Sequence, residues 1–366
     1  MQATLLGTLL PELSRTFTPG QSGTLASVQS LGLIIASFVT GPAIDRAGAR
    51  AGVLFGLALI ALALFILPSA HGYVPLLFVM ALMGLGGGVI STSSNTMASE
   101  LGGANQASTL NLLNVFFGVG GLATPALGAL LSEAALCRLI ALVSLCGIAL
   151  QLSTPTSQIP GGRGFQNAKD TRQLFQPLFV LLSMFVLLYV AAEVGVWNWL
   201  ALYLTGRGMP KNQALHVLSF GFAAGIVTGR LAASRIPLRF RPASITLACS
   251  VLMALATSAL LLTSGALSAG AAVFCAGLFM GPVYPTTLAL VSQAFPRGTA
   301  TAIGIAVTMG WIGVGLSSRL IGSIAGDNPN RLGTALLVIP GLSVLMCFVN
   351  LTFQRWLPRS AVPAQP

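Results

Sequence analysis

Charged side chains are scarce in this sequence. Only 7% of the 366 residues are charged, and just 7 residues are Asp or Glu. A water-soluble domain carries about 25% charged residues, so this chain cannot cover a water-facing surface with polar groups. Its hydrophobic share of 55% calls for another solvent, and a lipid bilayer supplies one. The composition therefore excludes an ordinary soluble globular protein.

Cysteine and histidine are also few. The five cysteines form no CxxC pair, and the two histidines, His71 and His216, lie far apart in the chain. We interpret the cysteines as small buried hydrophobic residues and expect neither a metal site nor a cofactor. No nucleophile with a neighbouring base can be recognised, so we expect no enzymatic activity.

Basic residues outnumber acidic ones, 18 to 7, which gives a formal net charge of +11. On a soluble protein this charge would suggest a nucleic-acid partner. Here the basic residues lie in short loops between apolar runs, and no groove of alternating aromatic and basic residues is present. The sequence therefore indicates orientation in a membrane and no nucleic-acid partner.

Long apolar runs, such as 53–67 and 247–263, dominate the chain. Lipid cannot satisfy backbone donors and acceptors, so spanning segments must be helices or closed barrels. The alternating strands of about 10 residues that a barrel requires are absent. We predict an all-α membrane protein with twelve spans, at 2–13, 21–43, 51–69, 73–98, 105–131, 135–153, 175–204, 211–233, 243–263, 267–293, 298–323 and 332–354.

The longest polar interruption, about 153–173, divides these spans into six and six. A polar linker in the middle of a twelve-span chain is typical of two structural repeats. We expect an N-terminal six-helix bundle over 1–153, a cytoplasmic linker over 154–174 and a C-terminal six-helix bundle over 175–366. Residues 1–10 would rise only about 15 Å as a helix, so the first span is expected to be truncated.

The orientation follows from the distribution of Lys and Arg. Loops on the linker's side of the membrane hold twelve of these residues and loops on the other side hold five, so both termini are expected to be cytoplasmic. The twelve are Arg46, Arg50, Arg163, Lys169, Arg172, Arg230, Arg235, Arg239, Arg241, Arg297, Arg355 and Arg359, and the five are Arg15, Arg138, Arg207, Lys211 and Arg331.

The loop between the second and third spans reads GPAIDRAGAR. A glycine at its start allows close helix contact, its acid can accept from a helix N-terminus or pair with a base, and its second glycine permits a tight turn. The two arginines can hold the neighbouring bundle. The pattern resembles the loop signature of the major facilitator superfamily, carried by Gly41, Asp45, Arg46, Gly48 and Arg50.

Three further stretches resemble the fucose permease-like, sugar-type branch of that superfamily. They are NTMASEL (95–101) with LNLLNVFFGVG (110–120), YVAAEVGVWNWL (189–200) and GPVYPT (281–286). The resemblance implies two bundles around a central cavity, alternating access, and a small polar, sugar-like solute. It also implies a multi-pass monomer in the inner (plasma) membrane, surrounded by lipid and coupled to protons or facilitative.

Glu193 lies deep in an apolar run. An ionised carboxylate there costs at least about 2.5–3.5 kcal/mol on insertion scales, so it is expected to face a cavity or to carry a proton. The alternative is a structural hydrogen bond to a neighbouring helix. Trp197 is four residues further on the same helix face, where it can pack on a sugar ring or anchor the interface. Asn198 carries a weaker form of the same argument.

Asn95, Asn111 and Asn114 are amides inside apolar helices, and the last two share a helix face. They can bind substrate hydroxyls, or they can simply join helices at about 0.6 kcal/mol each. The resemblance places a histidine at the position of Asn114, so a function that depends on its titration would not transfer.

Two alternatives remain open. The fifth span, with Gly120, Thr124, Pro125 and Gly128, weakly resembles the signature of proton antiporters, which favours an efflux carrier for amphipathic compounds. The short first span and Ala49, where the superfamily loop has a second basic residue, instead favour a non-transporting or degenerate homologue.

Overall fold

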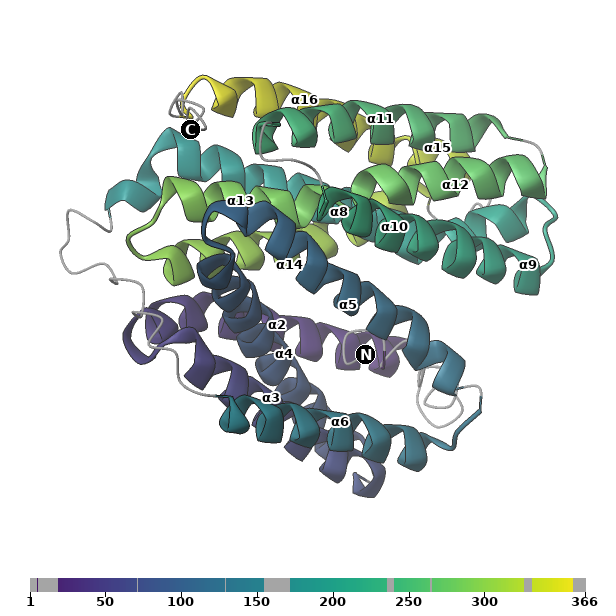
Figure 1. Ribbon diagram of the computed structural model, residues 1–366. Helices are drawn as coiled ribbons and strands as arrows, with labels where there is room; N and C mark the ends of the chain where they lie inside the picture. Colours follow the sequence, from purple (N-terminus) through teal and green to yellow (C-terminus); the bar gives the residue numbers. More distant parts are fainter. Residues whose placement is uncertain are drawn as a thin grey trace. The chain divides into compact units, whose positions relative to one another are not determined.

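The computed structural model describes residues 5, 19–70, 72–128, 130–154, 172–235, 240–263, 265–325 and 331–357. Over these residues every regular element is helical and no strand occurs (Figure 1). The predicted all-α class is therefore confirmed. The expected first span, 2–13, lies outside the described residues except for Leu5, which is helical and buried.

Among the described residues before 154 the chain forms five long helices, and glycines or a serine cap mark several of their ends. Gly48 separates the first two helices at a φ of 84°, which favours glycine, and Ser132 caps the fifth by accepting from the Ala135 N–H. The helices are α2 (Pro19–Ala47), α3 (Ala49–Ile66), α4 (Tyr73–Gly102), α5 (Gln106–Gly128) and α6 (Glu133–Ser153).

The later helices include two that are interrupted. A π-helical turn, Val217–Ala223, joins α9 (Lys211–His216) to α10 (Ala224–Ala233), and Gly281-Pro282 separates α12 (Ala266–Met280) from α13 (Val283–Ala294). Proline lacks the N–H of a continuous helix and clashes with the preceding turn. The others are α8 (Pro177–Gly206), α11 (Pro242–Leu262), α14 (Thr299–Ala325), α15 (Leu332–Ala335) and α16 (Val338–Gln354).

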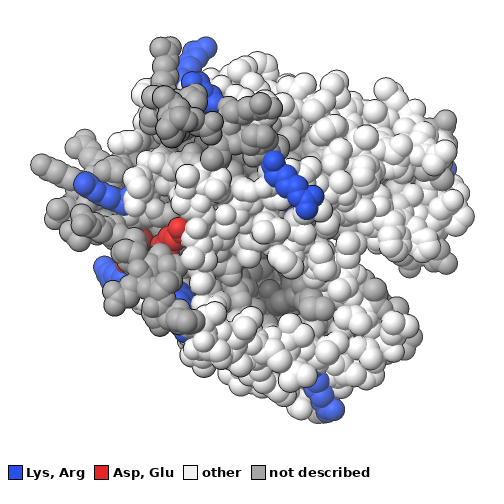
Figure 2. All heavy atoms as spheres, in the orientation of Figure 1, with Lys and Arg blue, Asp and Glu red and all other residues white. Residues whose placement is uncertain are grey.

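Nine helical stretches of the described chain are long and apolar enough to cross a membrane. One of them, Tyr73–Thr124, holds both α4 and α5, and a shorter apolar helix covers Val217–Ala233. Large hydrophobic side chains such as Phe78, Phe116 and Leu262 are exposed, and the face drawn in Figure 2 shows only scattered charges. Such a surface suits lipid, and it agrees with the spans expected after the first.

The chain forms two compact units. The first comprises Met1–Leu101, Phe116–Gln166 and Phe295–Thr308, and the second comprises Gly102–Val115, Asn167–Ala294 and Met309–Pro366. The division expected at the 154–174 linker stays a prediction, because the start of α5 groups with the later helices and the start of α14 with the earlier ones. Most of the linker lies outside the described residues.

Glycines bring helix backbones together in both units. A Cβ added to Gly84 in α4 would lie 2.2 Å from the Gln29 carbonyl oxygen of α2. In the second unit, a Cβ on Gly277 of α12 would lie 2.3 Å from the Phe222 oxygen, and one on Gly229 of α10 would lie 2.1 Å from the Leu278 oxygen. Small residues at helix contacts are the usual way to pack helices in lipid.

Candidate functional site

A charge pair of a buried arginine and a partly accessible carboxylate lies in the second unit. Glu193 of α8 and Arg230 of α10 approach to 3.8 Å between Oε1 and Nη2, and their side chains are 16% and 4% exposed. Away from water each charge would be costly alone, so each stabilises the other in the fold. The carboxylate is the more accessible member of the pair.

Two backbone carbonyls fix the Arg230 guanidinium. Its Nη1 donates to the Asn114 oxygen of α5 at 3.0 Å, and its Nε donates to the Gly281 oxygen at 3.2 Å. The residue four positions after Gly281 is Pro285, which has no N–H to close the helical hydrogen bond. Arg230 therefore joins α8, α5 and the break between α12 and α13.

One tyrosine lies beside this pair and stacks on a second tyrosine. Tyr189, one turn before Glu193, is fully buried and stacks on Tyr284 of α13 with ring centroids 6.3 Å apart. The Tyr189 hydroxyl lies beside both charged groups, but within the described part of the chain it makes no hydrogen bond of ordinary geometry. An unused hydroxyl next to a charge pair is available to a ligand or to water.

The two predicted amides of α5 border the same cluster. Asn111 is buried, and its Nδ2 donates to the Thr286 hydroxyl of α13 at 3.1 Å, while its Oδ1 has no hydrogen-bond partner among the described residues. The backbone carbonyl of Asn114 accepts from Arg230, and its side chain donates to the Leu110 oxygen. Glu193, Arg230, Tyr189, Tyr284, Asn111, Asn114 and Thr286 are called the polar cluster below.

Three other predicted site residues lie outside the polar cluster. Asn95 belongs to the first unit, where its Nδ2 donates to the Ser91 oxygen at 2.7 Å. Trp197 packs edge-on against Phe222 with centroids 5.1 Å apart, and Asn198 is exposed. Their proposed contacts with a substrate stay predictions.

The sequence did not identify Arg230 as a site residue, because its position after an apolar run suggested a cytoplasmic loop. That interpretation is wrong: Arg230 lies within α10 and is only 3% exposed. The signal was the need of Glu193, a charge within an apolar helix, for a counter-charge. The positions of charged residues in the sequence do not by themselves show which basic residue provides this counter-charge.

The loop motif forms a second polar site, within the first unit. The Asp45 carboxylate accepts from the N–H groups of Ala300 and Thr301, at 3.3 and 3.0 Å, and from the Thr301 hydroxyl. These donors are the free N–H groups at the start of α14, where negative charge is favoured. Gly41 permits this contact, because a Cβ there would lie 2.7 Å from the Ala300 oxygen.

The motif's arginines do not join Asp45 there. Arg50 donates to the backbone oxygens of Gln151 and Thr154, at 2.5 and 3.1 Å, at the C-terminal end of α6. Arg46 is exposed. Arg50 thus holds a helix of its own half of the chain, whereas we expected both arginines to hold the neighbouring bundle.

Arg50→Gln should destabilise the protein by about 0.5–1.5 kcal/mol, because the last carbonyls of α6 lose a charged donor. Thermal melting of the detergent-purified protein measures the effect. Arg46→Gln is the matched control and should melt like the parent protein. Equal losses in the two variants would show that general charge, and not the bonds to α6, matters.

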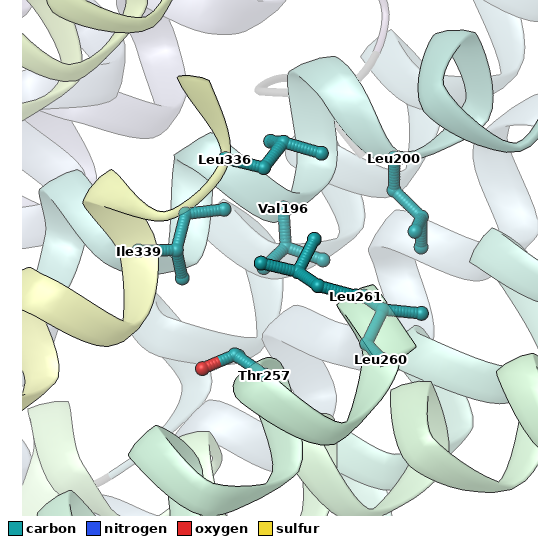
Figure 3. A pocket seen from close by; sticks show the side chains of 7 residues that line it. All are labelled: Val196, Leu200, Thr257, Leu260, Leu261, Leu336 and Ile339. Carbon is teal, nitrogen blue, oxygen red and sulfur yellow. The ribbon is translucent and has the colours of Figure 1, made fainter. Parts of the chain in front are cut away.

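A small apolar pocket lies elsewhere in the second unit (Figure 3). Its walls come from α8, α11 and the α15–α16 segment, and its hydroxyl, on Thr257, already donates to the Met253 oxygen at 2.7 Å. The lining offers no converging polar groups and is a packing gap between helices. The lining residues are Val196, Leu200, Thr257, Leu260, Leu261, Leu336 and Ile339.

Known proteins share both the sequence pattern and the fold. The sequence-family model of the Major Facilitator Superfamily matches residues 1–318 of this chain. The 3-(3-hydroxy-phenyl)propionate transporter of Escherichia coli (strain K12) is 27% identical over 353 residues, which cover 92% of this chain and 85% of that protein.

Two solved structures are similar along nearly their whole length. The E. coli fucose:proton symporter FucP has a TM-score of 0.81 at 19% identity, covering 96% of this chain and 95% of its own. The proton:xylose symporter XylE has a TM-score of 0.77 at 15% identity, covering 98% and 92%. The fold that the resemblance to the fucose permease-like branch implies is confirmed. With its family model matched over most of its length, this chain belongs to the Major Facilitator Superfamily and is a multi-pass membrane transporter of small solutes, not an enzyme.

Proposed function

We propose that this protein moves a small polar solute across the cytoplasmic membrane by alternating access, coupled to protons through Glu193. The observation that supports this most directly is a partly accessible carboxylate, otherwise costly in a membrane, held 3.8 Å from a buried arginine. A group placed in this way can exchange a proton and change partners as the protein changes conformation.

The relatives support the same direction. FucP is a fucose:proton symporter and XylE a proton:xylose symporter, and the relative that is 27% identical is a 3-(3-hydroxy-phenyl)propionate transporter. The distribution of Lys and Arg supports a cytoplasmic position for both termini. We also propose that the protein works as a monomer, with its two halves as the moving bundles.

Uptake by proteoliposomes tests the proposal. A panel of sugars, polyols and small acids is offered with and without an inward proton gradient, and we expect saturable uptake that the gradient accelerates. Failure of every solute to move under any imposed gradient would reject transport. Uptake of amphipathic drugs alone would instead support the efflux alternative.

Glu193→Gln should abolish the acceleration by the proton gradient, because an amide cannot carry the proton, while leaving solute exchange between the two sides measurable. Glu133→Gln, an exposed acid at the start of α6, is the matched control and should behave like the parent protein. Retention of full proton dependence in Glu193→Gln would show that Glu193 is a structural partner of Arg230.

A further inference from the structure

The Arg230 guanidinium has donors left over. Its Nε and Nη1 each donate to one carbonyl, but its Nη2 meets Glu193 only at 3.8 Å, which is beyond hydrogen-bond distance. A guanidinium can bind a carboxylate through two parallel N–H groups, and this geometry is among the strongest polar contacts in proteins. The ion pair as it stands is therefore loose, and a carboxylate that approaches Nη2 more closely would bind the guanidinium more strongly.

We propose that Arg230 anchors the carboxylate of an acidic, hydroxyl-bearing substrate, which takes the place of Glu193. This inference rests on the proposed transport function and names the substrate class for that same site. Glu193 is the accessible side of the pair, so both a proton and a second carboxylate reach it before they reach Arg230.

The charge balance explains why a proton must accompany the substrate. The loose pair is neutral, so one added carboxylate would leave a net negative charge in a site of low dielectric constant, which is costly. When a proton from the aqueous phase binds a Glu193 oxygen, the acid becomes neutral and Arg230 pairs with the substrate. On release the proton leaves Glu193, and the original pair forms again.

Few other titratable or charged groups lie near Glu193 in the described part of the chain. Arg230 and Tyr189 face the carboxylate, and Tyr284 stacks behind Tyr189. Helix α16, packed on α8, has no charged residue, and at the end of α8 the short helix α9 places His216 against Phe220. Arg319 is the charged residue of α14, and its side chain lies outside the described part of the structure.

The hydroxyl requirement comes from unused polar atoms. The Oδ1 of Asn111 is a buried acceptor without a partner among the described residues. The Tyr189 hydroxyl lies beside Glu193 and Arg230 but makes no hydrogen bond of ordinary geometry within the same part of the chain. Buried polar atoms normally find partners, so these two favour a ligand that brings its own hydroxyl groups. A sugar acid or another hydroxylated monocarboxylate meets both demands.

Binding of a matched set of probes to the purified full chain tests this inference. The probes are gluconate, its amide and glucose, with lactate as a second hydroxy acid, at mildly acidic and mildly alkaline pH. We expect both acids to bind more tightly at acidic pH, and both neutral compounds to bind roughly 10- to 100-fold more weakly than gluconate there, because they lack the charged contact.

Two variants separate a substrate anchor from a structural pair. Glu193→Gln imitates the protonated acid, so gluconate should bind it with acid-pH affinity at both pH values. Arg230→Lys keeps the charge without the fork and should lose roughly tenfold or more in gluconate affinity. Glu133→Gln should retain the pH dependence of the parent protein.

Three results would overturn the inference. They are failure of both acids to bind, equal affinity for gluconate and its amide, and an unchanged pH dependence in Glu193→Gln. Proton-driven uptake of glucose without gluconate binding would reject the acidic substrate and leave the proposed function intact, whereas absence of proton-driven uptake of any solute would reject both.

Discussion

Gly277→Ala is expected to destabilise the protein by about 1–3 kcal/mol, which is the usual cost of forcing extra volume into a packed core. The added methyl would lie 2.3 Å from the Phe222 carbonyl oxygen and 3.0 Å from the Ile226 nitrogen. Both are backbone atoms that cannot rotate away, so α12 must move apart from α10 and from the π-helical turn before it. Thermal melting in detergent measures the loss.

This separation should also reduce transport, because Arg230 of α10 reaches the Gly281 oxygen only when the two helices lie close together. Gly270→Ala is the matched control on the same helix, since a Cβ there meets nothing within 4 Å. It should be neutral or stabilising by up to about 1 kcal/mol, because alanine favours a helix over glycine. Similar losses in both variants would contradict the packing argument.

Asp45→Asn should slow transport roughly tenfold or more, since hydrogen bonds to a charged group contribute about 1.5–3 kcal/mol. The carboxylate joins the end of α2 to the first N–H groups of α14. The bonded residues are 255 and 256 positions apart in the chain. The amide keeps one acceptor oxygen but loses the charge that the helix N-terminus favours. Initial uptake rates in proteoliposomes measure the effect.

Thr301 separates the contributions of its side chain and backbone. Thr301→Val removes the hydroxyl donor to Asp45 and leaves both N–H donors, so its effect should be smaller than that of Asp45→Asn. Thr301→Ser keeps the hydroxyl and should transport like the parent protein. Full activity of Asp45→Asn would show that the contact with α14 does not control the transport cycle.

Several local features could be read from the sequence. The positions of the spans follow from hydropathy, which is a property of each segment by itself, and the described helices agree with the expected spans after the first. The expected span over 267–293 is present but broken at Gly281-Pro282, and the missing N–H of proline explains the break. Glu193 could be singled out because a charge in an apolar run is conspicuous without any knowledge of its surroundings.

The partners of these residues could not be read in the same way. Asn111 and Asn114 belong to the polar cluster while Asn95 lies in the other unit, although all three are amides in apolar helices. Arg50 holds α6, and Asp45 holds α14, although the two residues share one loop motif. In each case the residues look alike in the sequence, by type or by shared motif, yet their partners in the structure differ.

The sequence by itself determined the helices, their membrane setting and the presence of an acid within an apolar helix. Only the tertiary structure decided that Arg230 is its counter-charge and that α5, α8 and the α12–α13 break meet around it. The physical reason is that helix formation and lipid burial depend on neighbouring residues. Which side chains meet depends on the rotation and packing of whole helices, and Arg230 and Asn114 are 116 residues apart.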